Sequence, residues 1–221
     1  MSKYIGAIFD LDGVLVDTAV FHYLAWRELA DELMIPFDYQ DNERLKGVSR
    51  MESLSIILSL ALPGTASFRL FDERERSLLA ERKNKLYVDM IQNSSNMALL
   101  PGTRNTLQQL RRKGIRIALG SSSKNAPLII DRLGITEYFD VIIDGRHVSK
   151  SKPDPEVFLL AAQKMMIDPG SCIVFEDSAA GLKAARSAGM FAVGIGLPEN
   201  LTDAEFVIPG MQPDQIISLF D

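Results

Sequence analysis

Residues 4–15 read YIGAIFDLDGVL, a nearly all-apolar run that reaches Asp10 and continues through Asp12 and Gly13. Such a run is typical of a strand buried on both faces of a parallel sheet. Four further runs rich in Ile, Val or Phe follow, at residues 115–119, 141–143, 172–175 and 191–195. Helical patterns alternate with them at residues 103–113, 126–133, 155–166 and 178–188, with a last helix expected at 214–220. This alternation predicts an α/β fold with a doubly wound, Rossmann-like parallel sheet.

Residues 16–94 interrupt the alternation, because no convincing buried strand occurs there. Helical patterns occupy residues 18–34, 51–62 and 72–92 instead. Residues 61–67, with Pro63 and Gly64, separate two of these helices, and the polar residues 93–96 lead back to the α/β pattern. We therefore expect a core formed by residues 1–15 and 95–221 and an inserted helical cap formed by residues 16–94.

The composition indicates an ordinary soluble enzyme-sized chain of 221 residues, with 47% apolar and 24% charged residues. A formal net charge of -5 argues against nucleic acid as a partner. The single cysteine, Cys172, excludes an intramolecular disulfide and fits a reducing compartment. The start MSKYIGAIFD has no export-signal pattern, and no apolar run approaches the roughly 20 residues of a membrane span. We expect a cytoplasmic monomer that acts on a small molecule, with neither membrane nor nucleic acid as partner.

Asp10 and Asp12 stand where the first strand is predicted to end, and ligands of open parallel sheets bind just beyond such ends. In an extended backbone the two side chains would project to the same side. A hard divalent ion such as Mg²⁺ would relieve their repulsion. Asp10 could then attack phosphorus while Asp12 handles a proton. The alternative is a simple Asx-type turn before Gly13.

Two later strand ends carry groups suited to phosphate. Residues 120–125 read GSSSKN, and small residues before a helix let backbone donors approach an anion. Ser121 is the best candidate for direct contact, although a serine-rich turn with a helix cap is the simpler alternative. Lys152, held next to Pro153, would supply positive charge, unless it is an ordinary surface lysine.

A third strand end carries Glu176 and Asp177, adjacent acids directly after a buried strand. They would complete the metal site. The alternative is that Asp177 or Ser178 only caps the following helix.

This order of nucleophile, phosphate loop, lysine and acidic pair resembles the haloacid dehalogenase-like phosphotransferases over residues 4–195. The resemblance implies that Asp10 becomes an aspartyl-phosphate and that Asp12 is the acid/base. Ser121 and Lys152 would hold the transferring phosphate. One Mg²⁺ per chain would be held by Asp10, Asp12 (also through its backbone carbonyl), Glu176 and Asp177.

The cap motifs refine this resemblance. They are Asp17-Thr18, His22, Trp26, the segment LKGVSR at 45–50, and Arg82-Lys83-Asn84, and they resemble the β-phosphoglucomutase family. The resemblance implies an isomerase that interconverts β-glucose 1-phosphate and β-glucose 6-phosphate through bound β-glucose 1,6-bisphosphate. The substrate-binding residues implied are Trp26, Gly47, Val48, Ser49, Arg50, Ser53, Lys83, Ser121, Ser122, Ser123, Lys124, Asn125 and Lys152.

Arg50 would grip the second phosphate of the bisphosphate with its planar fork. His22 would orient Asp12 when the cap closes, and Thr18 would start a helix and mark the hinge. The simpler alternatives are a solvated arginine and, for His22 and Trp26 four residues apart, packing on one helix face.

Two residues depart from the family pattern, since Gly120 and Ser122 stand where we expect alanine. Both are small, so the phosphate loop stays credible. The main rival function is a sugar-phosphate phosphatase with the same nucleophile. A non-catalytic phosphosugar-binding module is a second rival, disfavoured because Asp10, Asp12 and Lys152 are all present.

Overall fold

The computed structural model describes residues 3–45, 47–94 and 97–221. The chain divides into two compact units, Met1–Asp17 with Ala98–Asp221 and Thr18–Met97. The boundaries lie slightly beyond those expected after residues 15 and 94. Within the described ranges, we find no helix with the length and apolar character needed to span a bilayer.

The first unit is built on a parallel sheet of six strands in the order β3-β2-β1-β4-β5-β6. This confirms the predicted fold class. The strands are β1 Gly6–Phe9, β2 Arg116–Gly120, β3 Val141–Ile143, β4 Cys172–Glu176, β5 Phe191–Ile195 and β6 Phe206–Ile208. The sequence pattern missed β6, a three-residue edge strand whose first residue, Phe206, is 43% exposed. Its apolar run FVI is no shorter than that of β3, the other three-residue edge strand, which was predicted, so length does not explain the miss.

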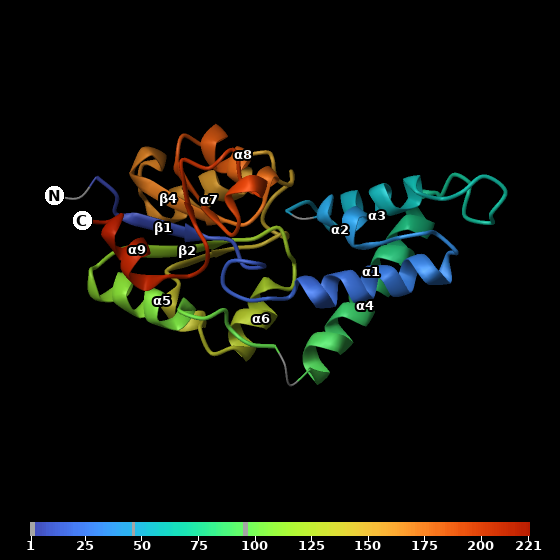
Figure 1. Cartoon of the computed structure of the whole chain (residues 1–221), viewed down its shortest axis with the longest axis horizontal. Coiled ribbons are helices and arrows are strands. Elements are labelled where there is room, and N and C mark those ends of the chain that lie inside the picture. Colours follow the sequence, from blue (N-terminus) through green and yellow to red (C-terminus); the bar gives the residue numbers. More distant parts are fainter. Residues whose placement is uncertain (1–2, 46, 95–96) are drawn as a thin grey trace. The chain divides into compact units, whose positions relative to one another are not determined.

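Helices cover both faces of this sheet (Figure 1), with α7 and α8 on one face and α5 and α9 on the other. The helices of this unit are α5 Thr103–Arg112, α6 Ala126–Arg132, α7 Glu156–Met165, α8 Ala179–Ser187 and α9 Pro213–Ser218. Short 3-10 turns complete it at η1 Thr136–Tyr138, η2 Pro169–Ser171 and η3 Pro198–Asn200. Ile8, Val174, Phe158 and Leu182 are fully buried between the sheet and α7 and α8. Burial of these apolar side chains is the main stabilising contribution to the unit.

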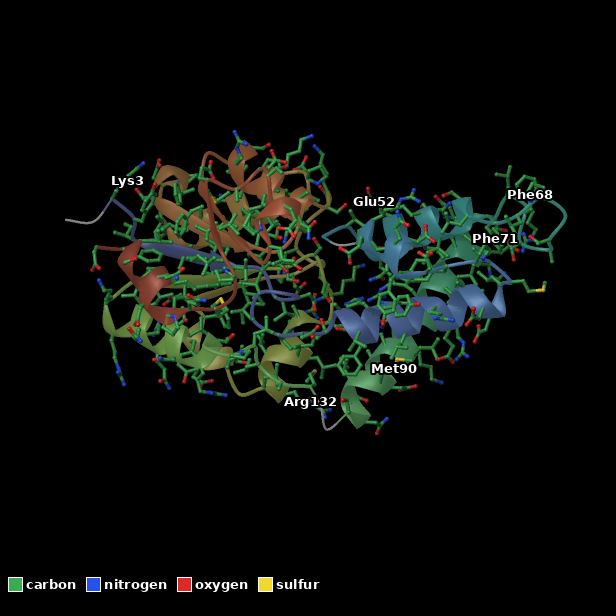
Figure 2. The ribbon with its side chains drawn as sticks, in the orientation of Figure 1. Lys3, Glu52, Phe68, Phe71, Met90 and Arg132 are labelled. Carbon is green, nitrogen blue, oxygen red and sulfur yellow. The ribbon has the colours of Figure 1, made fainter. Side chains whose placement is uncertain are left out.

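The second unit is helical, as expected for the cap. Its helices are α1 Ala19–Glu32, α2 Tyr39–Glu43, α3 Arg50–Ser59 and α4 Glu73–Asn93. The sequence pattern missed α2, which has five residues and depends on a capping box between Asp38 and Asp41. Phe68 and Phe71 lie on the loop between α3 and α4 (Figure 2), where a break was predicted. Part of the predicted return at 93–96 lies outside the described residues.

Candidate active site

Three neighbouring strands bring the predicted core residues to one edge of the sheet. Phe9, the last residue of β1, pairs with Leu119 of β2 and Phe175 of β4. Asp10 therefore follows β1 between the ends of β2 and β4, and its N–H donates to the Phe175 carbonyl at 3.0 Å. Asp10 is only 7% exposed, because β1 lies inside the sheet with β2 on one side and β4 on the other.

Lys152 joins two of the predicted acids. Its Nζ donates to Asp10 Oδ1 at 2.6 Å and also bonds Glu176 Oε1. The ammonium lies 4.9 Å from the centroid of the Phe158 ring, and the lysine side chain is fully buried. The surface-lysine alternative is therefore wrong: this lysine is a charge built into the interior.

Burial controls the electrostatics of this cluster. Burial, the largest cause, and repulsion by Glu176 and Asp12 together raise the pKa of Asp10 to about 7, although Lys152 acts in the opposite direction. Burial alone would lower the pKa of Lys152, yet the carboxylates of Asp10 and Glu176 raise it above its ordinary range. The ammonium therefore stays charged, and two buried carboxylates share one positive partner.

Glu176 is held on its other oxygen by the start of α8. Its Oε2 accepts hydrogen bonds from Ser178 N at 2.9 Å and Ser178 Oγ at 2.8 Å. The same hydroxyl caps α8 by accepting from Gly181 N at 3.1 Å. Ser178 thus caps α8 and also holds the Glu176 carboxylate, so capping of this helix does not exclude a role for Glu176 in the site.

Gly181 is a site residue that the sequence analysis missed. A Cβ atom at this position would lie 2.0 Å from the Glu176 carboxyl carbon, so only glycine leaves room for the carboxylate. The only signal in the sequence is its place three residues after the helix cap.

The chain turns immediately after Asp10, with Gly13 N donating to Val16 O at 2.8 Å. Gly13 has a φ of 77°, and a Cβ there would lie 2.0 Å from Asp177 Oδ2. The chain therefore turns at Gly13, as the alternative interpretation had it, and Asp12, just before this turn, forms an isolated β-bridge with Val16. Asp177 nevertheless lies against this turn, and Asp12 is near enough to raise the pKa of Asp10.

The predicted phosphate loop follows β2. Ser121 is 1% exposed, and its Oγ accepts a hydrogen bond from Ser123 N at 3.1 Å. Ser123 Oγ accepts in turn from Asn125 N at 3.2 Å, just before α6. Ser122 is partly exposed on this turn and Lys124 is exposed.

The unexpected glycine before this loop has a packing reason. A Cβ at Gly120 would lie 3.0 Å from the ring of Phe158, the residue that also contacts Lys152. Glycine therefore lets the ring lie close under the strand.

The four expected metal ligands supply only carboxylate and carbonyl oxygen, which suits a hard cation such as Mg²⁺. The excess negative charge around Lys152 also favours a cation. Among the residues that the structure describes, however, no three acidic, His or Cys side chains converge as a metal site does. Glu176 faces Lys152 and Ser178 instead. The donor chemistry fits Mg²⁺, and binding would require the acids to draw together.

In the cap unit, a buried lysine joins α1 and α4. Lys83 is 2% exposed, and its Nζ lies 2.8 Å from His22 Nδ1. It also lies 4.7 Å from the Trp26 ring centroid and 4.8 Å from that of Tyr87. Burial, Lys83 and Arg50 hold the pKa of His22 well below its usual range, so the neutral ring accepts from the ammonium. His22 and Trp26 do pack on one helix face, and what they pack on is Lys83.

The predicted arginine is oriented by a residue on α4. Arg50 Nη2 donates to Asn84 Oδ1 at 2.8 Å. Ser49 caps α3, because its Oγ accepts from Glu52 N at 3.3 Å. Ser53 is 4% exposed on the same helix. Arg50 is thus held in place by a side-chain partner rather than freely solvated.

Three further predicted residues precede the helices of the cap. Gly47 adopts a φ of 75°, the left-handed region that favours glycine, and Val48 beside it is partly exposed. Thr18 is the N-cap residue of α1, so this helix begins there as predicted, without a side-chain capping hydrogen bond. Its carbonyl accepts from His22 N at 3.0 Å.

Comparison with known proteins identifies the family. A family model described as haloacid dehalogenase-like hydrolase matches residues 6–189. A β-phosphoglucomutase of Bacillus subtilis (strain 168) is 45% identical over 201 residues, 91% of this chain and 87% of that protein. A phosphorylated carbohydrates phosphatase of Thermotoga maritima is 31% identical over 219 residues, covering 96% of both chains. The crystal structure of a β-phosphoglucomutase from Clostridium difficile matches with a TM-score of 0.90 and 41% identity, covering 98% of this chain and 97% of that one. The chain therefore belongs to the haloacid dehalogenase-like hydrolase family.

Proposed function

We propose that this chain has β-phosphoglucomutase activity and is thus an isomerase. It interconverts β-glucose 1-phosphate and β-glucose 6-phosphate through an aspartyl-phosphate and β-glucose 1,6-bisphosphate. The observation that carries the proposal is the buried Lys152 bonded to Asp10, which sets a nucleophilic carboxylate beside a fixed positive charge. The relatives named β-phosphoglucomutase, at 45% and 41% identity, support the choice of reaction.

Asp10 is the nucleophile. A carboxylate oxygen of Asp10 attacks phosphorus, and the bond from phosphorus to the sugar oxygen breaks as the new bond forms. Asp12 donates its proton to the departing sugar oxygen and takes a proton from the sugar hydroxyl in the reverse direction. Lys152 stabilises the negative charge on the transferring group, and Ser121 holds one of its oxygens.

Two transfers complete the reaction. The phosphoryl group of phospho-Asp10 passes to the 6-hydroxyl of β-glucose 1-phosphate, which gives the 1,6-bisphosphate. The sugar then reverses, and its 1-phosphoryl group passes to Asp10, leaving β-glucose 6-phosphate. Each transfer forms and breaks one bond between phosphorus and oxygen, so phosphate is conserved.

Asp10, Asp12, Glu176 and Asp177 would hold Mg²⁺, which family membership implies as a requirement. When bound, this ion neutralises charge on the transferring phosphoryl group. The chain's own contribution is to aim the Asp10 carboxylate and to hold it beside Lys152, whose positive charge favours the ionised form, while burial and repulsion by Glu176 and Asp12 bring the pKa to about 7.

The cap unit would hold the far end of the bisphosphate. Arg50 binds the non-reacting phosphate with the help of Asn84, next to Gly47, Val48 and Ser49. Trp26, Ser53 and Lys83 line the sugar site, and Ser122, Ser123, Lys124 and Asn125 add contacts from the core unit. Residue Thr18 serves as the hinge and His22 orients Asp12. We further propose a cytoplasmic monomer with a cap spanning residues 16–94.

The rival is a phosphatase with the same nucleophile, and relatives of that activity exist at 31% and 34% identity. The product of β-glucose 1-phosphate decides between them. Incubation with Mg²⁺ and a trace of the bisphosphate should yield glucose 6-phosphate. Inorganic phosphate without glucose 6-phosphate would establish the phosphatase instead.

Asp10→Asn tests the nucleophile. The variant should keep its circular dichroism spectrum and lose turnover, because an amide oxygen is a poor nucleophile toward phosphorus. Asp131→Asn, at an exposed position on α6 in the same unit, is the matched control and should keep full activity.

A further inference from the structure

The loop that carries Lys152 is tied down by a carboxylate that the proposed mechanism does not use. Glu156, the first residue of α7, accepts hydrogen bonds from Ser149 N at 3.1 and 3.0 Å and from Lys150 N at 2.8 Å. Ser149 Oγ donates to the same two oxygens at 3.2 and 3.0 Å. These donors lower the pKa of Glu156, so the carboxylate is charged at neutral pH.

The segment enclosed by this contact is short and cross-linked. Between Lys150 and Glu156, Asp154 N donates to Ser151 O at 3.0 Å, and Asp154 Oδ1 accepts from Glu156 N at 3.0 Å. Lys152 lies inside this closed segment and points inward, since its side chain is fully buried while Ser149 and Lys150 are exposed. The position of the Lys152 backbone therefore depends on a contact at the surface.

The far side of the lysine is held by the same helix. Phe158, two residues beyond Glu156 on α7, lies 4.9 Å from Lys152 Nζ. Glu156 holds the loop against the start of α7, and Phe158 contacts the Lys152 ammonium from the same helix. Both contacts set the reach of Lys152 toward Asp10.

We propose that Glu156 is a positioning residue for Lys152: by bonding Ser149 and Lys150 it holds the loop 149–155 on α7 and keeps the ammonium between Asp10 and Glu176. This inference rests on the proposed role of Lys152 in phosphoryl transfer. A misplacement of about 1 Å can cost about a hundredfold in rate, so a surface contact can matter to chemistry. The competing explanation is that Glu156 only stabilises the loop.

Glu156→Gln separates the two explanations, because it keeps the size of the side chain and removes its charge. The control is Glu137→Gln, at an exposed glutamate of η1 in the same unit. We expect kcat to fall by about tenfold or more in Glu156→Gln, KM to rise a few-fold because the contact of Lys152 with phosphate weakens, and the midpoint of urea unfolding to change little. Glu137→Gln should match the wild type in all three. An unchanged kcat, or a loss explained by a lower unfolding midpoint, would overturn the proposal.

A double-mutant cycle asks whether Glu156 acts through Lys152. The dissociation constant for inorganic phosphate is measured by calorimetry for the wild type, Glu156→Gln, Lys152→Ala and the double variant. In the protein that keeps Lys152, Glu156→Gln should weaken phosphate binding. In the Lys152→Ala background, the same substitution should change phosphate binding by less than about twofold. An equal effect in both backgrounds would contradict the proposal. If Lys152→Ala does not fold, the kcat, KM and urea results of Glu156→Gln decide the matter alone.

The same variants remain informative if the wild type proves to be a phosphatase. The ratio of variant to wild-type kcat is then measured on released phosphate, since Lys152 would hold the phosphate in either reaction. Failure of the mutase proposal appears in the wild-type product, and failure of the positioning proposal appears in the ratio.

Discussion

Asp10→Asn should make the protein more stable at alkaline pH while it abolishes turnover. The wild-type carboxylate is 7% exposed, and its pKa rises from an ordinary 3.8 to about 7, first through burial and then through repulsion by Glu176 and Asp12. The folded state therefore opposes ionisation of this group. In the variant Lys152 keeps its bond to Glu176, so no buried ammonium is left unpaired.

Proton linkage gives the direction and the magnitude of this effect on the free energy of unfolding. Between the unfolded pKa of 3.8 and the folded value of about 7, the folded wild type binds more protons than the unfolded chain, so its stability falls as pH rises. At 1.36 kcal/mol per pH unit, the loss by pH 8 is about 4 kcal/mol. Asn does not titrate, so the variant escapes this loss. The free energy of unfolding of Asp10→Asn should exceed that of the wild type by up to about 4 kcal/mol at pH 8 and by little at pH 4.

The assay is urea unfolding followed by circular dichroism, at pH values from 4 to 8 with a chelator present. Asp131→Asn is the control and should parallel the wild type. Adding Mg²⁺ should stabilise the wild type and narrow the difference, because the ion favours the ionised form of Asp10. Parallel pH dependences for the wild type and Asp10→Asn would refute the reasoning, since they would show that burial imposes no such cost.

Three further variants test the buried cluster around Lys152 and the proposed site of the second phosphate. Lys152→Ala leaves carboxylates buried without their partner and should destabilise the protein by about 3–5 kcal/mol at pH 8 in urea unfolding; a neutral result would mean that the cluster is solvated. Gly181→Ala should destabilise the protein in urea unfolding and weaken Mg²⁺ binding by about tenfold in calorimetry, because its Cβ would lie 2.0 Å from the Glu176 carboxyl carbon and displace that buried carboxylate; unchanged affinity would exclude Glu176 as a ligand. Arg50→Lys should raise KM for the bisphosphate by about tenfold with a smaller effect on kcat, because an ammonium cannot grip phosphate with two parallel bonds; an unaffected KM would place the second phosphate elsewhere.

Much of the fold follows from local pattern. Apolar runs marked five of the six strands, with β3 and β5 predicted to the residue, because a strand buried on both faces needs nearly every side chain apolar. Glycines after α5, α6 and α8 marked where those helices end. The sequence pattern missed α2, whose five residues are too few to show a helical period, and it missed β6, although the apolar run of β6 is as long as that of β3.

The candidate site, too, could be predicted only in part from the sequence. The sequence predicted Asp10 as a nucleophile and Glu176 as a metal ligand, because acidic residues directly after buried strands need a reason to be there. It predicted Lys152 as a positive charge for phosphate, although this lysine lies well beyond Ile143, the last residue of β3. It could not show that Lys152 bonds both acids, one of them 142 residues away along the chain. Nor could it reveal Glu156 as the anchor of that lysine.

The physical reason is that local sequence sets the secondary structure, whereas the whole fold sets which distant residues come into contact. Side-chain periodicity is a property of neighbouring residues, so sequence determines which segments become strands and helices and which residues stand at their ends. Pairing register and sheet order are properties of the whole core, and only they decide that the ends of β1, β2 and β4 lie side by side. Burial then converts that proximity into a charged lysine and a carboxyl group with a raised pKa, which no stretch of sequence contains by itself.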